Sequence, residues 1–206
     1  VRAGGALPVR VLSTDEEAHY GFLGAVNAST LEDGWFLDIG GGSLQVGDVR
    51  ARELVRSMSR PLGAVRLTEA FLSGDQRAKD EVKALRAHVR ATLGEVRWIR
   101  PRGGRLVGVG GAVRTLAVMH QRRHAHPLYD PQGYRLSREG LSELVADVLT
   151  LPAAQRDRIP GLKTDRADII LAAVAQSGGK LRFDDFTPLP CGDPNCATIG
   201  YLLKVS

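Results

Sequence analysis

Cysteine is scarce in this chain of 206 residues, which contains only Cys191 and Cys196. Two cysteines are too few for a disulfide-stabilised scaffold or for a four-cysteine zinc site. The short segment that joins them could hold a metal or a redox pair, but no partner cluster supports that, and a plain turn is favoured. We therefore expect stability to come from a packed core, which a chain of this length can bury.

Long apolar runs are also missing, although a membrane protein or a secretion signal would need one. No run approaches the roughly 20 residues that span a bilayer, and the first residues lack the charged-then-apolar pattern of a signal peptide. The chain does not begin with Met, so we expect it to be processed, trimmed or cut from something longer. Cytoplasm is the predicted compartment, with neither a membrane nor a nucleic acid duplex as partner.

Acidic residues are in modest deficit, because 23 Asp and Glu oppose 28 Lys and Arg and leave a formal net charge of +5. Most of this positive charge is arginine, which binds phosphate oxygens in a bidentate manner. An arginine-biased, GC-rich genome explains the same excess and is the favoured cause. The basic run His120–His126 could bind a polyanion, but we prefer a solvated helix end. Arg66 and Glu69 are expected to form an ordinary surface pair.

Strand and helix patterns alternate along the chain. Short apolar runs predict strands, and apolar residues spaced by three and four predict helices. The predicted strands are 8–12, 34–39, 44–49, 53–58, 105–109 and 183–186. The predicted helices are 14–27, one that starts within 62–69, 77–96, one that ends near 122, one that follows Ser137, 164–175 and 196–204. This mixture predicts an α/β fold with a mixed sheet flanked by helices.

Two glycine clusters follow predicted strands, namely Asp38–Ser43 and Gly108–Ala112. Glycine lets a ligand approach the backbone closely, and successive N–H groups in such a turn can hold an anion. The second cluster leads into a helix N-terminus, which also favours anions. Neither cluster has the Lys and hydroxyl residue of a P-loop, and Val113 stands where a dinucleotide fingerprint needs its third glycine. The pair predicts phosphate binding more strongly than it predicts simple strand connections.

Acidic residues gather at the start of the first predicted helix, at Asp15, Glu16 and Glu17. Adjacent carboxyl groups raise one another's pKa, and a carboxylate with a raised pKa is a usable general base. However, acids also complement the helix dipole, and Thr14 with Glu17 fits a capping box. Spacing alone therefore favours a structural role for Glu17.

Six motifs occur in a fixed order along nearly the whole chain: Leu12–Ala18, Leu37–Ser43, Pro61–Glu69, Val107–Arg114, Gly133–Ser137, and Pro160–Leu162 with Arg166–Ile170. In this order they resemble the exopolyphosphatase and guanosine-pentaphosphate phosphatase (Ppx/GppA) family. The resemblance implies the actin-like ATPase fold, in which two ribonuclease-H-like domains face a cleft. It implies that residues 1–30 are a lead-in strand and helix from the end of the first domain. Residues 31–206 would then form the second ribonuclease-H-like domain.

The resemblance also implies roles for particular residues. Glu17, which precedes the alanine of the family's Glu-Glu-Ala motif, corresponds to the catalytic glutamate. Asp38 is implied as a ligand of Mg²⁺ or another divalent cation. The implied phosphate-binding residues lie in two loops: Gly40, Gly41, Gly42 and Ser43 in the first, and Gly108, Gly110 and Gly111 in the second.

Two features depart from the family pattern. The family's first phosphate loop, an Asp-Gly-Ser-Asn-Ser motif, does not precede these motifs, so the chain is expected to carry mainly the second domain. Gln45 stands where the family usually has a glutamate associated with metal binding and activity. Glutamine keeps the shape of that side chain but loses its charge, which makes it a poorer ligand for a hard divalent cation.

The resemblance implies hydrolysis of the terminal phosphate of inorganic polyphosphate or of guanosine pentaphosphate, and the sequence leaves both substrates open. The main alternative is a catalytically weak or inactive module that binds nucleotide or polyphosphate. Gln45 and the missing first loop favour that alternative. A third interpretation is another actin-like ATPase, such as a sugar or acetate kinase. A homodimer also stays open.

Overall fold

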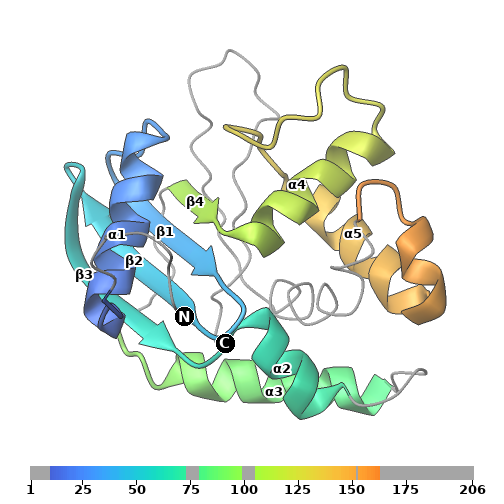
Figure 1. Ribbon diagram of the computed structural model, residues 1–206, viewed down its shortest axis with the longest axis horizontal. Helices are drawn as coiled ribbons and strands as arrows, with labels where there is room; N and C mark the ends of the chain where they lie inside the picture. Colours follow the sequence, from blue (N-terminus) through green and yellow to red (C-terminus); the bar gives the residue numbers. More distant parts are fainter. Residues whose placement is uncertain (1–9, 73–78, 99–104, 152, 163–206) are drawn as a thin grey trace, which may run out of the picture.

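The computed structural model describes residues 10–72, 79–98, 105–151 and 153–162 (Figure 1). In chain order its elements are α1 (Thr14–Asn27), β1 (Gly34–Ile39), β2 (Leu44–Arg50), β3 (Glu53–Arg60), α2 (Ala64–Phe71), α3 (Lys79–Gly94), β4 (Arg105–Val109), α4 (Gly111–Arg123), α5 (Arg138–Thr150) and a short 3₁₀ helix (Ala153–Arg158). The predicted elements at 164–175, 183–186 and 196–204 lie outside the described residues, as does the turn between the two cysteines.

Most of the predicted elements are present, with small shifts at their ends. The strands predicted at 34–39 and 105–109 have the predicted bounds. The strand predicted at 8–12 is wrong over its described part, because residues 10–12 have no regular structure. The Arg10 side chain instead forms an ion pair with Glu16, with Nη2 and Oε1 2.6 Å apart. The predicted α/β fold with a mixed sheet flanked by helices is confirmed.

The sheet has the strand order β3-β2-β1-β4. β1 is antiparallel to β2 and parallel to β4. A two-residue turn at Ala51 and Arg52, both with positive φ, joins β2 to β3, and such a short turn requires antiparallel neighbours. The parallel return to β4 needs a long crossover, which contains α2 and α3. As a result, β1 and β4 end at the same edge of the sheet, near the starts of α2 and α4 (Figure 1).

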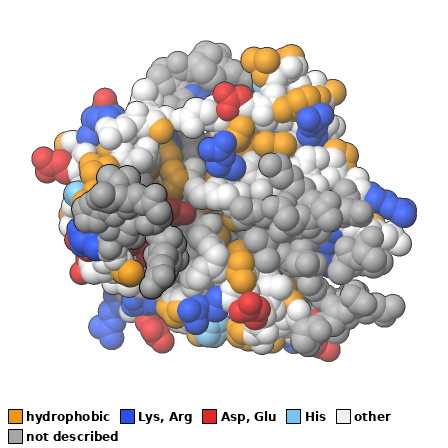
Figure 2. Space-filling view, in the orientation of Figure 1, with side chains coloured by type: hydrophobic (Ala, Val, Ile, Leu, Met, Phe, Trp, Pro, Cys, Tyr) orange, Lys and Arg blue, Asp and Glu red, His pale blue; other side chains and the backbone are white. Residues whose placement is uncertain are grey.

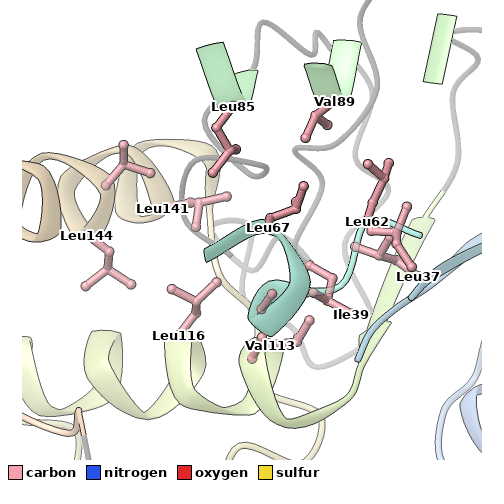
Figure 3. Packing of buried hydrophobic residues seen from close by; sticks show 14 of the residues in the cluster. Leu37, Ile39, Leu62, Leu67, Leu85, Val89, Val113, Leu116, Leu141 and Leu144 are labelled. Atoms are coloured by element: carbon pink, nitrogen blue, oxygen red, sulfur yellow. The ribbon is translucent and has the colours of Figure 1, made fainter. Parts of the chain in front are cut away.

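The side chains of β1 alternate between two core clusters, as a strand requires. Trp35, Leu37 and Ile39 join the larger cluster, whereas Phe36 joins the smaller one beneath α1. Figure 3 shows how the sheet and α2 to α5 converge in the larger cluster, with these residues among those labelled: Leu37, Ile39, Leu67, Leu85, Val113, Leu116 and Leu144. The side chain at position 38 therefore belongs to the face that α1 covers.

A capping box fixes the start of α1. Ser13 Oγ accepts a hydrogen bond from the Glu16 amide (3.2 Å), and the Glu16 carboxylate accepts one from the Ser13 amide (2.9 Å). The predicted box of Thr14 and Glu17 is therefore wrong by one residue. The side chain of Glu17 consequently has no part in the capping box, although it still lies in the first turn of α1, where an acid complements the helix dipole.

Charged side chains of both signs are interspersed on the described surface that Figure 2 shows. The excess of basic residues therefore does not form a single basic patch on the visible described part of this face. Among the described residues, no helix is both long and apolar enough to cross a bilayer.

Candidate functional site

The parallel pairing of β1 with β4 brings the two glycine clusters together. Asp38 is aligned with Val109 of β4, and Gly110 follows directly. Gly110 has φ +91°, and a Cβ built on it would lie 2.5 Å from Asp38 Oδ1 and 2.9 Å from the Ile39 carbonyl oxygen. Only glycine fits both this backbone angle and this close approach. Thus the turn after β4 packs directly on the carboxylate at the end of β1.

Glu17 of α1 lies at the same edge of the sheet. Asp38 shares the face of Phe36, which α1 covers, and a Cβ built on Gly21 of α1 would lie 3.6 Å from Asp38 Oδ2. Ser43 Oγ lies 3.4 Å from Glu17 Oε1 and 3.5 Å from Oε2, which are long contacts. Burial raises the pKa of Asp38, and the negative charge of Glu17 raises it further. The structure thus brings together three of the predicted site residues from distant parts of the chain.

The glycine loop between β1 and β2 has two different sides. The Gly40 amide bonds to the Ser43 carbonyl (3.0 Å) and closes the turn. Within the described part of the chain, the amides of Gly41, Gly42 and Ser43 have no hydrogen-bond partner. Gly41 and Gly42 are exposed, and a Cβ on Gly42 would meet nothing within 4 Å. Free, accessible amides are what an anion-binding turn needs.

The carbonyl side of the same loop binds the start of α2. The amide of Ala64 donates to Gly40 O (2.9 Å), and the amides of Val65 and Arg66 donate to Gly41 O (3.0 and 3.1 Å). A Cβ on Gly63 would lie 2.2 Å from Gly41 O, so this contact also depends on glycine. α2 therefore fixes the loop, and its own N-terminal amides are already used.

α4 begins differently. Its N-cap Gly110 offers no side chain, and among the described residues the first amide of α4 with a backbone partner is that of Arg114, which bonds to Gly110 O at 3.1 Å. For the amides of Gly111, Ala112 and Val113, the described residues supply no acceptor. Such free first-turn N–H groups favour an anion. They lie beside Asp38, at the edge where the glycine loop also lies.

Gln45 is a buried polar residue of this site, with 1% of its surface exposed. It is paired with Asp38 across β1 and β2, and its Nε2 donates to Ser43 Oγ (2.8 Å) and Ser59 Oγ (3.3 Å). The amide therefore orients the Ser43 hydroxyl beside Glu17. A glutamate at this position could not donate these hydrogen bonds when ionised.

The donor atoms of the site suit a hard cation that also binds phosphate. Glu17 and Asp38 supply carboxylates, and Ser43 supplies a hydroxyl oxygen. Mg²⁺ is usually held by one or two carboxylates together with water and substrate phosphates. Among the described residues, there is no group of three or more His, Cys, Asp or Glu side chains that could hold a metal by itself. The residues thus fit a Mg²⁺ ion that is completed by phosphate oxygens.

Glu16, the acid directly before Glu17, does not behave as predicted. A hydrogen bond from Arg10, together with a smaller effect of the Ser13 amide, lowers the pKa of Glu16 to about 2. The prediction that the neighbouring acids raise one another's pKa is therefore wrong for Glu16, because an arginine and a capping amide stabilise its charge. Glu16 is a structural residue of the helix start.

The basic run at 120–126 is largely tied to its own surroundings. Arg123 forms ion pairs with Glu143 and Asp147 of α5. Arg122 stacks over the Tyr129 ring at 3.6 Å, and His120 shares a 2.7 Å hydrogen bond with the Tyr134 hydroxyl. These contacts agree with the preferred structural interpretation of this run.

A pocket of about 180 Å³ lies beside the second glycine turn. Its walls come from the end of α1, from β4 and α4, and from the loop at 131–134, and its polar lining includes Arg114, Gln132 and Tyr134. Sequence reasoning did not single out Arg114 or Gln132. The signal for Arg114 was weak, since it is only the last residue of the motif Val107–Arg114.

The fold and the site define a class: an α/β protein whose polar site lies at the shared carboxyl edge of two parallel strands. A family model described as "Ppx/GppA phosphatase family" matches residues 1–176. The chain is 36% identical over 182 residues to an uncharacterized protein of Streptomyces coelicolor, which covers 84% of this chain and 53% of that protein. It is 33% identical over 177 residues to Exopolyphosphatase 2 of Mycobacterium tuberculosis, with coverages of 81% and 54%.

The solved structures agree. A crystal structure of the Aquifex aeolicus member of the Ppx/GppA protein family matches with a TM-score of 0.70 and 26% identity, over 82% of this chain and 55% of that chain. The chain therefore belongs to the Ppx/GppA phosphatase family. It spans about half the length of the curated relatives it matches.

Proposed function

We propose that this chain carries catalytic residues of a phosphohydrolase, at the edge of the sheet where β1 and β4 end. The enzyme removes the terminal phosphate of inorganic polyphosphate or guanosine pentaphosphate. The observation that carries this proposal is that Glu17, Asp38 and Ser43 lie close together. They lie where the parallel strands β1 and β4 are each followed by a glycine turn. Membership of the Ppx/GppA family and the name of the Mycobacterium tuberculosis relative, an exopolyphosphatase, support a phosphatase activity.

The two glycine turns, at residues 40–43 and at Gly110, would bind the phosphate groups. The amides of Gly41, Gly42 and Ser43 on one side, and those at the start of α4 on the other, would donate to non-bridging oxygens. Asp38 would hold Mg²⁺ together with phosphate oxygens. When bound, that ion offsets the negative charge of the transferred phosphoryl group.

Glu17 would act on the attacking water. Its carboxylate accepts a proton as the water oxygen bonds to the terminal phosphorus. The phosphoanhydride bond on the opposite side then breaks, and the bridging oxygen leaves with the shortened chain. The proton on Glu17 returns to solvent before the next cycle. Ser43, which Gln45 orients, would bind the same water or a phosphate oxygen.

A binding module without turnover is the second candidate function. Gln45 favours it, because its buried neutral amide fills a position beside Asp38 where a carboxylate would strengthen metal binding. Calorimetry separates the two candidates. Binding of guanosine pentaphosphate with Mg²⁺ but without phosphate release, in the full-length protein, would support the module.

The direct test is phosphate release from polyphosphate by the full-length protein and its Glu17→Gln variant. We expect a loss of at least about 100-fold in kcat, the contribution typical of a positioned general base. Glu16→Gln is the matched control, because Glu16 lies on the same turn but is engaged by Arg10 and Ser13. It should keep its kcat within a few-fold, and equal rates for Glu17→Gln and wild type would remove Glu17 from the mechanism.

A further inference from the structure

Arg66 is attached to the glycine loop by both its backbone and its side chain. Its amide donates to Gly41 O (3.1 Å), and its Nε donates to Gly42 O (3.1 Å). Because the neighbouring amides of α2 also bind the loop carbonyls, the base of the Arg66 side chain has a fixed position. The guanidinium therefore lies at the tip of the loop whose amides are free.

The rest of the guanidinium remains available. Arg66 is exposed, and the expected pair with Glu69 is not among the ion pairs of the described residues. Only Nε is used on the Gly42 carbonyl, so both terminal nitrogens can still donate. Two parallel N–H donors match the oxygens of a phosphate group.

The two carboxylates of the site would repel a polyanionic substrate, and the positive charge of Arg66 would offset this repulsion. Glu17 and Asp38 bring two carboxylates to an edge where a polyanion has to bind. In the described part of the chain, Arg66 is the only basic side chain with a hydrogen bond to the loop at 40–43. An oxyanion bound at the free amides of Gly41 and Gly42 would therefore lie on the same short loop as this cation.

We propose that Arg66 is a phosphate-binding residue of this site, which holds a non-bridging oxygen of the substrate's phosphate chain at the tip of the glycine loop. This inference rests on the proposed function, because it assigns Arg66 to the same substrate. The ligand is a linear or nucleoside-linked polyphosphate, and the contact is bidentate and charge-assisted. Arg66 acts on substrate affinity, whereas Glu17 acts on the chemical step.

The test measures binding of inorganic tripolyphosphate to the full-length protein by calorimetry, together with kcat and KM for its hydrolysis. Arg66→Ala should weaken binding roughly 10- to 100-fold, the range for a lost charge-assisted hydrogen bond. It should raise KM much more than it lowers kcat. Because one ionic contact is lost, its affinity should also fall less steeply with added salt than that of the wild type.

Two further substitutions separate charge from loop support. Arg66→Lys keeps the charge and should retain more affinity than Arg66→Gln, which keeps a donor for Gly42 O but is neutral. Arg90→Ala is the matched control, since Arg90 is an exposed arginine of α3 that has no hydrogen bond to the loop among the described residues. It should leave affinity and salt dependence unchanged.

The outcomes are distinguishable. If the wild type and Arg66→Ala bind tripolyphosphate equally well, the assignment of Arg66 is overturned while the proposed function stands. The same conclusion follows if Arg66→Gln retains the affinity of the wild type and Arg66→Lys does not. If wild type neither binds nor hydrolyses tripolyphosphate or guanosine pentaphosphate, the proposed function is overturned and the assignment with it.

Discussion

At the scale of single residues, Asp38 carries a carboxyl group in a place that disfavours its charge. It is half-buried between β4 and α1, with Gly110 against one oxygen and Glu17 nearby. Burial, and then Glu17, raise its pKa above the ordinary value of 3.8. A bound divalent cation would lower this pKa again, because its charge stabilises the ionised carboxylate.

The raised pKa of Asp38 predicts how stability depends on pH. Between the unfolded and folded pKa values the native state binds more protons, so this group lowers the free energy of unfolding as pH rises. The loss begins near the ordinary value of 3.8 and is complete above the folded pKa. The Asp38→Asn variant lacks this titration, so wild type should lose stability relative to that variant across this window. Urea unfolding at several pH values measures the difference, and a parallel course of the two curves would contradict the prediction.

Gln45 is a buried neutral residue that is paired with Asp38 across β1 and β2. Its amide is buried and donates hydrogen bonds to Ser43 and Ser59. An ionised carboxylate at position 45 could not donate these hydrogen bonds. A carboxylate there would also face Asp38 across the strand pair. The glutamine thus favours a stable metal-free site.

Gln45→Glu should lower the free energy of unfolding by about 2–3 kcal/mol without metal, because two donors are lost and a buried charge is added. Mg²⁺ should restore part of that loss and bind more tightly than in wild type. The control is Gln121→Glu, which makes the same change at a buried residue that donates to Asp130 O. Thermal unfolding with and without Mg²⁺ tests both, and rescue of both variants alike would count against a metal beside Asp38.

At the scale of elements, α2 and α4 both begin after a glycine that offers no side-chain cap. The first amides of α2 bind the carbonyls of the glycine loop. Those of α4 have no such acceptor among the described residues and lie beside Asp38. One helix therefore fixes the loop, and the other supplies the N–H groups that we assign to phosphate.

Gly110→Ala should destabilise the fold by about 2 kcal/mol or more, because alanine at φ +91° is strained and its Cβ would press on Asp38. Gly24→Ala is the matched control within α1, where a Cβ would meet nothing within 4 Å. It should stabilise by about 0.5–1 kcal/mol. Chemical unfolding of both variants gives the comparison, and equal effects of the two substitutions would contradict the close packing at Gly110.

At the scale of the whole molecule, the site depends on two layers that pack on opposite faces of one sheet. α1 packs through Phe22 on Phe36, with ring centroids 6.2 Å apart, and this layer carries Glu17. The helices of the larger cluster cover the other face. Of these, α2 binds the carbonyl groups of the loop between β1 and β2, and α4 begins at the glycine turn that follows β4. The sheet between the two layers therefore sets the separation of Glu17 from Ser43.

Two core truncations should have similar effects on stability and different effects on activity. Phe22→Ala in α1 and Leu85→Ala in α3 remove fully packed side chains and should each lower the free energy of unfolding by about 2–5 kcal/mol. At a temperature where both variants are folded, phosphate release should fall several-fold more for Phe22→Ala, since only α1 holds Glu17. Equal specific activities of the two variants would argue against this coupling.

The local structure followed from the sequence where local physics dominates. Apolar periodicity predicted β1 and β4 with their observed bounds, and Ser137 was correctly identified as the cap of α5. Prediction failed by one residue at the α1 cap, because Ser13 and Thr14 are equally good caps on spacing. Arg10, which pairs with Glu16, is not part of the capping motif that spacing can detect.

The sequence by itself determined the α/β pattern, the two glycine clusters and the family, because periodicity, turn chemistry and ordered motifs are local properties of a chain. Only the tertiary structure decided that Asp38 faces α1, that Gly110 touches it and that Arg66 binds the glycine loop rather than Glu69. These contacts depend on which face of the sheet a side chain occupies and on the parallel pairing of two strands that are far apart in the sequence. Such long-range pairings are set by the packed core as a whole.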